Sequence, residues 1–108
     1  MKGAAQVRQG WKHYRKGDFA AADVEFAKAV EASPQLAYGH LQQGMFWLRQ
    51  DRFEEAVNTF EQAVAAEPTN PAPAFFLALA LEQAERPEAA DEAFEKLKIL
   101  CPRHPCQS

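Results

Sequence analysis

The feature that most constrains the fold of this chain is a repeat of 34 residues that runs without insertions. Three columns of identical residues follow this spacing: Pro34, Pro68 and Pro102; Phe26, Phe60 and Phe94; and Ala22, Ala56 and Ala90. Three periods occupy nearly all of the 108 residues. A strict period of this length predicts a solenoid, because each repeat is one supersecondary unit that buries its apolar face only by stacking on its neighbours.

Each period contains two stretches in which apolar residues recur at helical spacing. In the second period Phe53, Ala56, Val57 and Phe60 form a stripe at i, i+3, i+4 and i+7. Short breaks separate the stretches, so neighbouring helices are expected to be antiparallel. The sequence therefore predicts an all-α fold of six antiparallel helices, over residues 3–16, 19–32, 37–50, 53–66, 71–84 and 87–100.

Residues that favour helix starts stand at several of these boundaries. Asp18 and Asn70 are suitable N-caps, and Pro71 suits a first helical position. Asp51 is followed three residues later by Glu54, which is the spacing of a capping box. These residues support the predicted starts of the second, fourth and fifth helices.

Small residues recur where the two helices of a hairpin should approach each other. The columns are Gly10, Gly44 and Ala78 in the first helices and Ala22, Ala56 and Ala90 in the second helices. A large side chain at either column would force the helices apart. The phenylalanine column is expected to fill the space between adjacent hairpins, where truncation to alanine costs about 3–5 kcal/mol.

These columns resemble the tetratricopeptide repeat family, whose 34-residue pattern contains Ala-x3-Phe-x2-Ala and then Pro. The matching residues are Ala22, Phe26, Ala29 and Pro34, then Ala56, Phe60, Ala63 and Pro68, then Ala90, Phe94, Leu97 and Pro102. The resemblance implies a right-handed solenoid of three helix-turn-helix hairpins, with repeats at about residues 3–36, 37–70 and 71–104. We expect a single domain over residues 1–102 and a flexible tail over residues 103–108.

The first half of each repeat departs from the family pattern. Gln9 and Gln43 occupy a position that the family fills with leucine. One interpretation is that they form hydrogen bonds across the repeat interface or lie half exposed, and the other is that they form a polar ladder that contacts a ligand.

In the family, the first helix of each hairpin lines a concave groove that binds an extended or helical segment of another protein. By position, the resemblance assigns to this groove Val7, Trp11, Tyr14, Arg15, Tyr38, Leu41, Met45, Leu48, Arg49, Phe75 and Leu79, with Glu82 and Gln83 at its end. This set is largely apolar, and its residue types are those favoured at interface cores. The alternative is that Leu41 and Leu79 only pack onto neighbouring hairpins. We expect an apolar partner segment, with an acidic group read by Arg15 or Arg49.

One subclass of the family holds acidic C-termini with a carboxylate clamp of lysine, asparagine and arginine. The residues at the clamp positions of this chain are Val7, Trp11, Gln42, Ala72 and Phe76. Most of the required donors are missing, so we expect no clamp.

Charge is distributed unevenly along the chain. The formal net charge is −3, yet residues 1–16 carry five basic groups and no acidic group. The balance argues against a general nucleic-acid binder, although a basic first helix that touches acidic lipid or nucleic acid is an alternative. No signal peptide or membrane-spanning stretch is visible, so we expect a cytoplasmic protein without membrane insertion.

The last predicted helix has no further helix to cover it. Phe94, Leu97 and Leu100 are therefore expected to have a partly bare flank. The acidic last helix and the basic first helix have opposite charges. Either the chain belongs to a longer repeat array, or it self-associates. The alternative function is therefore a self-assembling module that stacks head-to-tail into oligomers.

The sequence gives no indication of an enzyme, a cofactor or a metal site. No nucleophile with a base and no phosphate-binding or metalloprotease motif is present. Cys101, His104 and Cys106 are zinc-ligand types, but a structural zinc site needs a fourth ligand. His13 and His40 stand in aromatic columns of the repeat, where structural packing is expected.

Overall fold

The structure is a computed structural model that describes residues 3–100. Its helices are α1 (Ala4–Arg15), α2 (Phe19–Ala32), α3 (Ala37–Arg49), α4 (Phe53–Ala66), α5 (Pro71–Gln83) and α6 (Pro87–Leu100). Within the described range the chain contains no strand, and each helix begins and ends within one residue of its predicted bounds. The predicted all-α solenoid of three antiparallel hairpins is confirmed.

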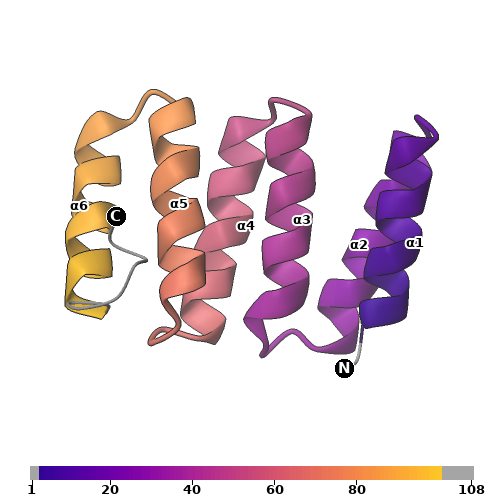
Figure 1. Cartoon of the computed structure of the whole chain (residues 1–108), viewed down its shortest axis with the longest axis horizontal. Coiled ribbons are helices and arrows are strands. Elements are labelled where there is room, and N and C mark those ends of the chain that lie inside the picture. Colours follow the sequence, from indigo (N-terminus) through magenta and orange to yellow (C-terminus); the bar gives the residue numbers. More distant parts are fainter. Residues whose placement is uncertain (1–2, 101–108) are drawn as a thin grey trace.

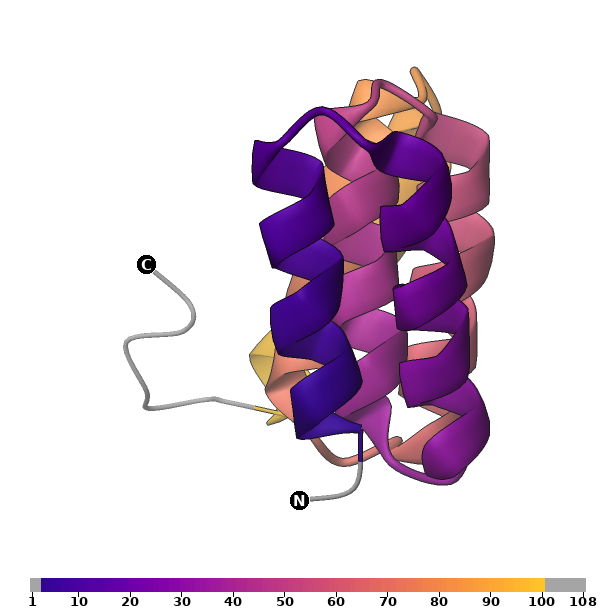
Figure 2. The same cartoon turned by 90° about the vertical axis from the view of Figure 1, so that its right-hand side faces the viewer.

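The hairpins stand side by side along the 37 Å long axis of the molecule. Figures 1 and 2 show α1, α3 and α5 on one side of the solenoid, with α2 and α4 behind them. Between hairpins, α2 packs on α3 and α4 packs on α5. The first helices of the three hairpins therefore share one broad face, and α1 and α6 stand at opposite ends of the stack.

The starts of two helices, α2 and α5, follow from their capping residues. The carboxylate of Asp18 accepts a hydrogen bond from the backbone N–H of Ala21, at 3.2 Å. The side chain of Asn70 accepts one from the N–H of Ala72, at 3.0 Å, and Pro71 is the first residue of α5. These side chains satisfy N–H groups that have no partner within the helix.

The predicted capping box at Asp51 is wrong. Asp51 has φ of 58° and lies in the left-handed region, and the residue before α4 is Arg52, which makes no side-chain cap. Asp51 instead ends α3: its N–H bonds to the Leu48 carbonyl at 3.0 Å and that of Arg52 bonds to the Trp47 carbonyl at 3.0 Å. This pair of bonds is a Schellman motif.

The same C-terminal motif recurs in every hairpin at the 34-residue spacing. Gly17 and Glu85 also have positive φ, at 81° and 59°, and each follows the end of a first helix. The turn within each hairpin therefore needs a left-handed residue, which only the first hairpin supplies as glycine.

The predicted role of the small residues is confirmed by the phenylalanines that face them. A Cβ atom added to Gly44 would lie 2.4 Å from Phe60 Cε1, and one added to Gly10 would lie 2.8 Å from Phe26 Cζ. Each ring therefore lies on the glycine of its own hairpin. Each ring also reaches the next hairpin, because Phe26 lies 5.1 Å from Phe46 between ring centres.

The buried core contains one large residue that the repeat did not indicate. Phe46 is 1% exposed and packs with Phe26 and Ala22 between the first two hairpins. The equivalent positions in the other hairpins hold Lys12 and Ala80, so no column marks this site. Phe46 was missed because its burial depends on the neighbouring hairpin and not on the period.

His40 is a structural residue, as predicted. Its side chain is 5% exposed, and its Nε2 lies 2.9 Å from the carbonyl oxygen of Pro34. The imidazole therefore ties α3 to the loop that precedes it, at a position where the family pattern has tryptophan.

Three expectations concern residues outside the described range. They are the flexible tail at 103–108, the zinc-ligand types at Cys101, His104 and Cys106, and the far end of the third repeat. Among residues 3–100, no helix is both long enough and apolar enough to cross a bilayer.

Candidate protein-binding face

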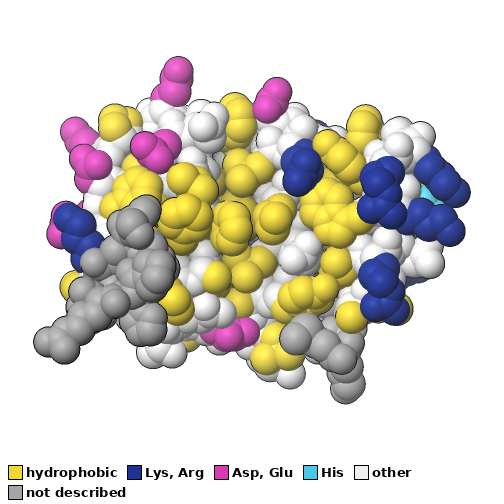
Figure 3. All heavy atoms as spheres, in the orientation of Figure 1, with side chains coloured by type: hydrophobic (Ala, Val, Ile, Leu, Met, Phe, Trp, Pro, Cys, Tyr) yellow, Lys and Arg dark blue, Asp and Glu magenta, His cyan; other side chains and the backbone are white. Residues whose placement is uncertain are grey.

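The face formed by α1, α3 and α5 carries a band of apolar side chains across all three hairpins. Figure 3 shows this band running along the long axis, with basic groups at the α1 end and acidic groups toward α5 and α6. Exposed apolar areas of this kind usually mark interaction sites in monomeric proteins. We call this surface the α1–α3–α5 face.

Trp11 is the residue that links the first two hairpins on this face. Its indole Nε1–H donates to the side-chain oxygen of Gln42 on α3, at 2.9 Å. The ring packs edge-on against Tyr14 at 5.4 Å and Phe26 at 4.8 Å between centres. Trp11 is half-buried, so one part of the indole is held by the core and another part remains exposed.

Arg49 covers the outer side of the same tryptophan. Its guanidinium carbon lies 5.4 Å from the centre of the Trp11 ring, which is cation–π geometry. Arg15 stands one period earlier on α1, and both arginine side chains are exposed. The α1–α3 end of the face therefore combines aromatic surface with two accessible guanidinium groups.

The middle and far parts of the face are aliphatic and aromatic. Leu41, Met45 and Leu48 on α3 are half-buried and pack against the core formed with α4 and α5. On α5, Leu79 is half-buried and Phe75 is 36% exposed. None of these side chains is fully buried, so each leaves apolar surface on the face.

Val7 must be removed from the predicted contact set. It is 4% exposed and belongs to the core cluster that contains Phe26 and Ala29. The equivalent residues one and two periods later, Leu41 and Phe75, become progressively more exposed. Val7 therefore supports the core of the first two hairpins and offers no contact surface.

The remaining predicted residues lie on the face as expected from their register, but in different environments. Tyr38 and Tyr14 are half-buried against the core of the first two hairpins, and Glu82 and Gln83 are exposed at the C-terminal end of α5. Gln9 is exposed and Gln43 is half-buried, which agrees with the first interpretation of this polar pair in part. Within residues 3–100, no side-chain hydrogen bond joins Gln9 to Gln43, so the two residues do not form a polar ladder.

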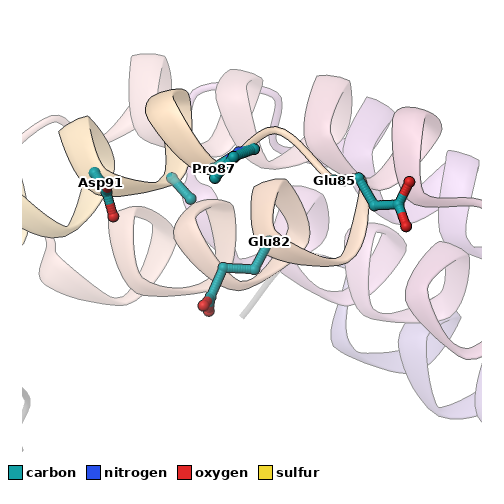
Figure 4. A pocket seen from close by; sticks show the side chains of 5 residues that line it. Glu82, Glu85, Pro87 and Asp91 are labelled. Carbon is teal, nitrogen blue, oxygen red and sulfur yellow. The ribbon is translucent and has the colours of Figure 1, made fainter.

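An acidic hollow opens where α5 meets α6. It has a volume of about 440 Å³ and is lined by Glu82, Glu85, Pro87, Ala90 and Asp91. Figure 4 shows that Glu82 and Asp91 come from the two facing helices, whereas Glu85 lies on the turn between them and points away. The described residues contain no group of three or more His, Cys, Asp or Glu side chains arranged to hold a metal ion.

The five clamp positions hold groups that already have structural roles or lack donors. Val7 is buried, Phe76 stacks on Phe60 at 5.7 Å between centres, and Trp11 donates to Gln42. Ala72 has no polar side chain. Of these residues, only Gln42 carries a side-chain amide, and its oxygen accepts the indole hydrogen.

Gln42 belongs to this face, but its role was not predicted from the sequence, where it was noted only as a clamp position that lacks the required residue. Its contact with Trp11 joins residues that are 31 positions apart. A polar residue two positions before Gly44 gave no local sign of this partner, since the bond depends on how α1 and α3 lie side by side.

Comparison with known families gives a match of residues 48–99 to the tetratricopeptide repeat. Among solved structures, the chain is similar to the first tetratricopeptide repeat domain of Spaghetti (RPAP3) bound to HSP90 peptide SRMEEVD, with a TM-score of 0.81, 19% identity, and coverage of 98% of this chain and 84% of that chain. The N-terminal domain of stress-induced protein-1 (STI-1) from C. elegans gives a TM-score of 0.82 at 20% identity, covering 95% of this chain and 86% of that chain.

A third similar structure is the type III secretion translocator chaperone SycD of Yersinia enterocolitica. Its TM-score is 0.80 at 14% identity, and the alignment covers 95% of this chain and 77% of that chain. The comparison with curated protein sequences gives no match. At these identities the similarity to solved structures establishes the fold, and the role of individual residues rests on the geometry above.

Proposed function

We propose that this chain, a solenoid of tetratricopeptide repeat hairpins, is a non-catalytic, cytoplasmic adaptor that binds a segment of another protein on its α1–α3–α5 face. The observation that carries this proposal is the apolar band that crosses three helices without being fully buried. Half-buried Trp11, Met45 and Leu79 and the 36% exposed Phe75 all contribute to it. Aromatic residues, methionine and arginine are enriched at the cores of protein interfaces.

The distribution of groups along the face indicates the kind of segment that would bind. Apolar side chains occupy its centre, so the central residues of the partner should be apolar. Arg15 and Arg49 stand at the α1–α3 end, where an acidic side chain or a terminal carboxylate would meet two guanidinium groups. Binding is therefore proposed to depend mainly on apolar burial, with one charged contact that sets the register.

The proposal excludes the carboxylate clamp of the chaperone-binding subclass. Similar domains have been solved with HSP90 and HSP70 peptides, which supports peptide binding as the general function of this fold. In this chain, however, the buried Val7, the stacked Phe76 and the apolar Ala72 occupy positions where that subclass has charged or amide donors. A fluorescein-labelled SRMEEVD peptide should show no saturable binding, and submicromolar binding would contradict this part of the proposal.

Peptide selection on the intact chain tests the main proposal. A random peptide library is displayed on phage and selected on the immobilised protein, and each enriched peptide is synthesised with a fluorescent label. Fluorescence anisotropy then gives its Kd at low and high salt. We expect enriched peptides to share spaced apolar residues and an acidic residue, and to lose less than tenfold in affinity when salt is raised.

Two substitutions of the same chemical type locate the binding surface. Met45→Asp places a charge in the centre of the α1–α3–α5 face, and Val24→Asp places one on α2, where Val24 is 53% exposed. We expect Met45→Asp to weaken binding at least tenfold and Val24→Asp to leave the Kd unchanged, with circular dichroism confirming that both variants fold. Equal effects of the two substitutions would refute the assignment of this face.

A further inference from the structure

At both interfaces between hairpins, a phenylalanine of the second helix packs against a phenylalanine of the next first helix, although the two partners stand at different positions of the repeat. Phe26 on α2 packs against Phe46 on α3, and Phe60 on α4 stacks on Phe76 on α5. Phe26 and Phe60 are both fully buried. Beside Phe60, Val57 is also fully buried in the same core cluster as residues of α5. Each second helix thus presents a phenylalanine to the first helix of the following hairpin.

The last helix, α6, carries the equivalent phenylalanine in a different environment. Phe94 stands one period after Phe60 but is only half-buried. Asp91 stands one period after the buried Val57 and is exposed, and Glu95 beside it is also exposed. The α6 flank, defined here by Asp91, Phe94 and Glu95, is therefore a partly uncovered ring with carboxylates around it.

The first helix carries the complementary set. Lys12 stands one period before Phe46, and Arg8 stands two periods before Phe76. Both side chains are exposed, and residues 3–16 contain no acidic group. The α1 flank, defined here by Arg8 and Lys12, therefore offers cations at the two positions that contact the phenylalanine of the preceding hairpin elsewhere in the solenoid.

We propose that the α6 flank of one copy of this chain binds the α1 flank of a second copy, in the arrangement by which α4 packs on α5. Arg8 and Lys12 of the second copy would then lie over the Phe94 ring and beside Asp91 and Glu95. A cation over an aromatic face is attractive, and the adjacent carboxylates add ion pairs of the correct sign. This proposal concerns a different surface from the α1–α3–α5 face and does not depend on the proposed function.

The position of the two flanks determines the form of the assembly. The flanks lie on α1 and α6, at opposite ends of the stack (Figure 1), and Figure 3 shows basic groups gathered at the α1 end and acidic groups toward the α6 end. The contact is therefore heterologous, and each added copy exposes a new flank of the same kind. Association should be weak, because all the charges are exposed and Lys98 already pairs with Glu95 at 3.1 Å.

Sedimentation velocity on the full chain tests this proposal, at protein concentrations up to about 1 mM and at low and high salt. We expect the weight-average mass at low salt to rise above 12.1 kDa with concentration. At high salt it should fall back toward the mass of the monomer, because salt screens exposed pairs. A mass that stays at 12.1 kDa under all of these conditions would overturn the proposal.

Charge reversal identifies the flanks. The variant with Arg8→Glu and Lys12→Glu and the variant with Asp91→Lys and Glu95→Lys should each remain monomeric alone. An equimolar mixture of the two should associate again, because both kinds of junction then join opposite charges. Failure of the mixture to associate would overturn the proposed pairing.

A third variant controls for net charge. Glu31→Lys with Glu61→Lys changes the net charge by the same amount as the α6 variant, but both residues are exposed on other helices. We expect this control to associate as the wild type does, and loss of association in it would assign the effect to net charge and overturn the proposal. Peptide binding by the α6 variant, measured by anisotropy, should be unchanged, which separates this test from that of the proposed function.

Discussion

Replacing Gly44 by alanine sets two well-understood effects against each other. Alanine is the better helix former by about 1 kcal/mol in a helix interior, so propensity alone predicts a more stable protein. The structure predicts the opposite sign, because Gly44 lies under the ring of Phe60. The substitution therefore tests whether the packing of the hairpin, and not its helix propensity, explains the glycine.

The magnitude follows from the space available at Gly44. The added Cβ would lie 2.4 Å from Phe60 Cε1 and 2.7 Å from two further ring carbons. Carbon atoms in favourable contact are about 3.5–4.0 Å apart, so roughly an ångström of movement is needed. Phe60 is fully buried and cannot turn outward. Overpacking of this kind costs about 1–3 kcal/mol, so after the propensity gain of about 1 kcal/mol we expect a net loss of up to about 2 kcal/mol.

Urea denaturation followed by circular dichroism at 222 nm gives the free energy of unfolding. Gly10→Ala serves as a graded comparison, because its added Cβ would meet the far end of the Phe26 ring at 2.8 Å, a milder overlap. Gly44→Ala should therefore destabilise more than Gly10→Ala. In the double variant Gly44→Ala with Phe60→Leu, the overlap is removed, so the combined loss should be smaller than the sum of the single losses.

The third hairpin already contains the substitution and shows when it is tolerated. Ala78 is fully buried at the position equivalent to Gly44, and the phenylalanine of that hairpin, Phe94, is only half-buried. A ring that is not covered by a following hairpin has room to move. If Gly44→Ala raised the free energy of unfolding by about 1 kcal/mol, as an exposed helical site would, the packing argument would be refuted.

Four further substitutions test the turns and the core by the same denaturation assay. Glu85→Gly should raise the free energy of unfolding by up to about 1 kcal/mol, because Glu85 is exposed and has φ of 59°, and Gly17→Ala should lower it by about 1 kcal/mol; a loss on Glu85→Gly would contradict the proposed strain. Asn70→Ala removes the bond to the Ala72 N–H and should cost about 0.5–2 kcal/mol, and no change would show that water replaces this cap. Phe60→Ala should cost about 3–5 kcal/mol, and a cost below about 1 kcal/mol would mean that the ring is not the centre of the core.

The strict period made the secondary structure and the hairpin packing predictable. Helix bounds were predicted within one residue because the apolar spacing and the proline column repeat three times, and because the N-caps at Asp18 and Asn70 are local signals. The pairing of Gly44 with Phe60 was also predictable in kind, since a small residue in register with a large one in every repeat indicates close approach. The period did not determine the backbone conformation of the turn residues. Asp51 matches a capping box in the local sequence, but it adopts the left-handed conformation that ends α3.

The environment of individual residues on the candidate face was decided by tertiary structure. Val7, Leu41 and Phe75 occupy one column of the repeat, yet their exposure rises from 4% at Val7 to 36% at Phe75. Position in the repeat is a property of the sequence, but exposure depends on what lies against each helix, which differs between the first, middle and last hairpins. The column could therefore identify a shared face without showing which members reach its surface.

By itself, then, the sequence determined that this protein is a stack of three helical hairpins, because the repeat fixes which local segments are helical and which of their sides must be buried. Tertiary structure alone decided that Trp11 bonds to Gln42 and lies under Arg49, and that Phe46 fills the space between the first two hairpins. These contacts join helices of different hairpins, and their partners lie 20 to 38 residues apart in the sequence. No local pattern specifies such contacts, because they arise only when the hairpins are packed side by side.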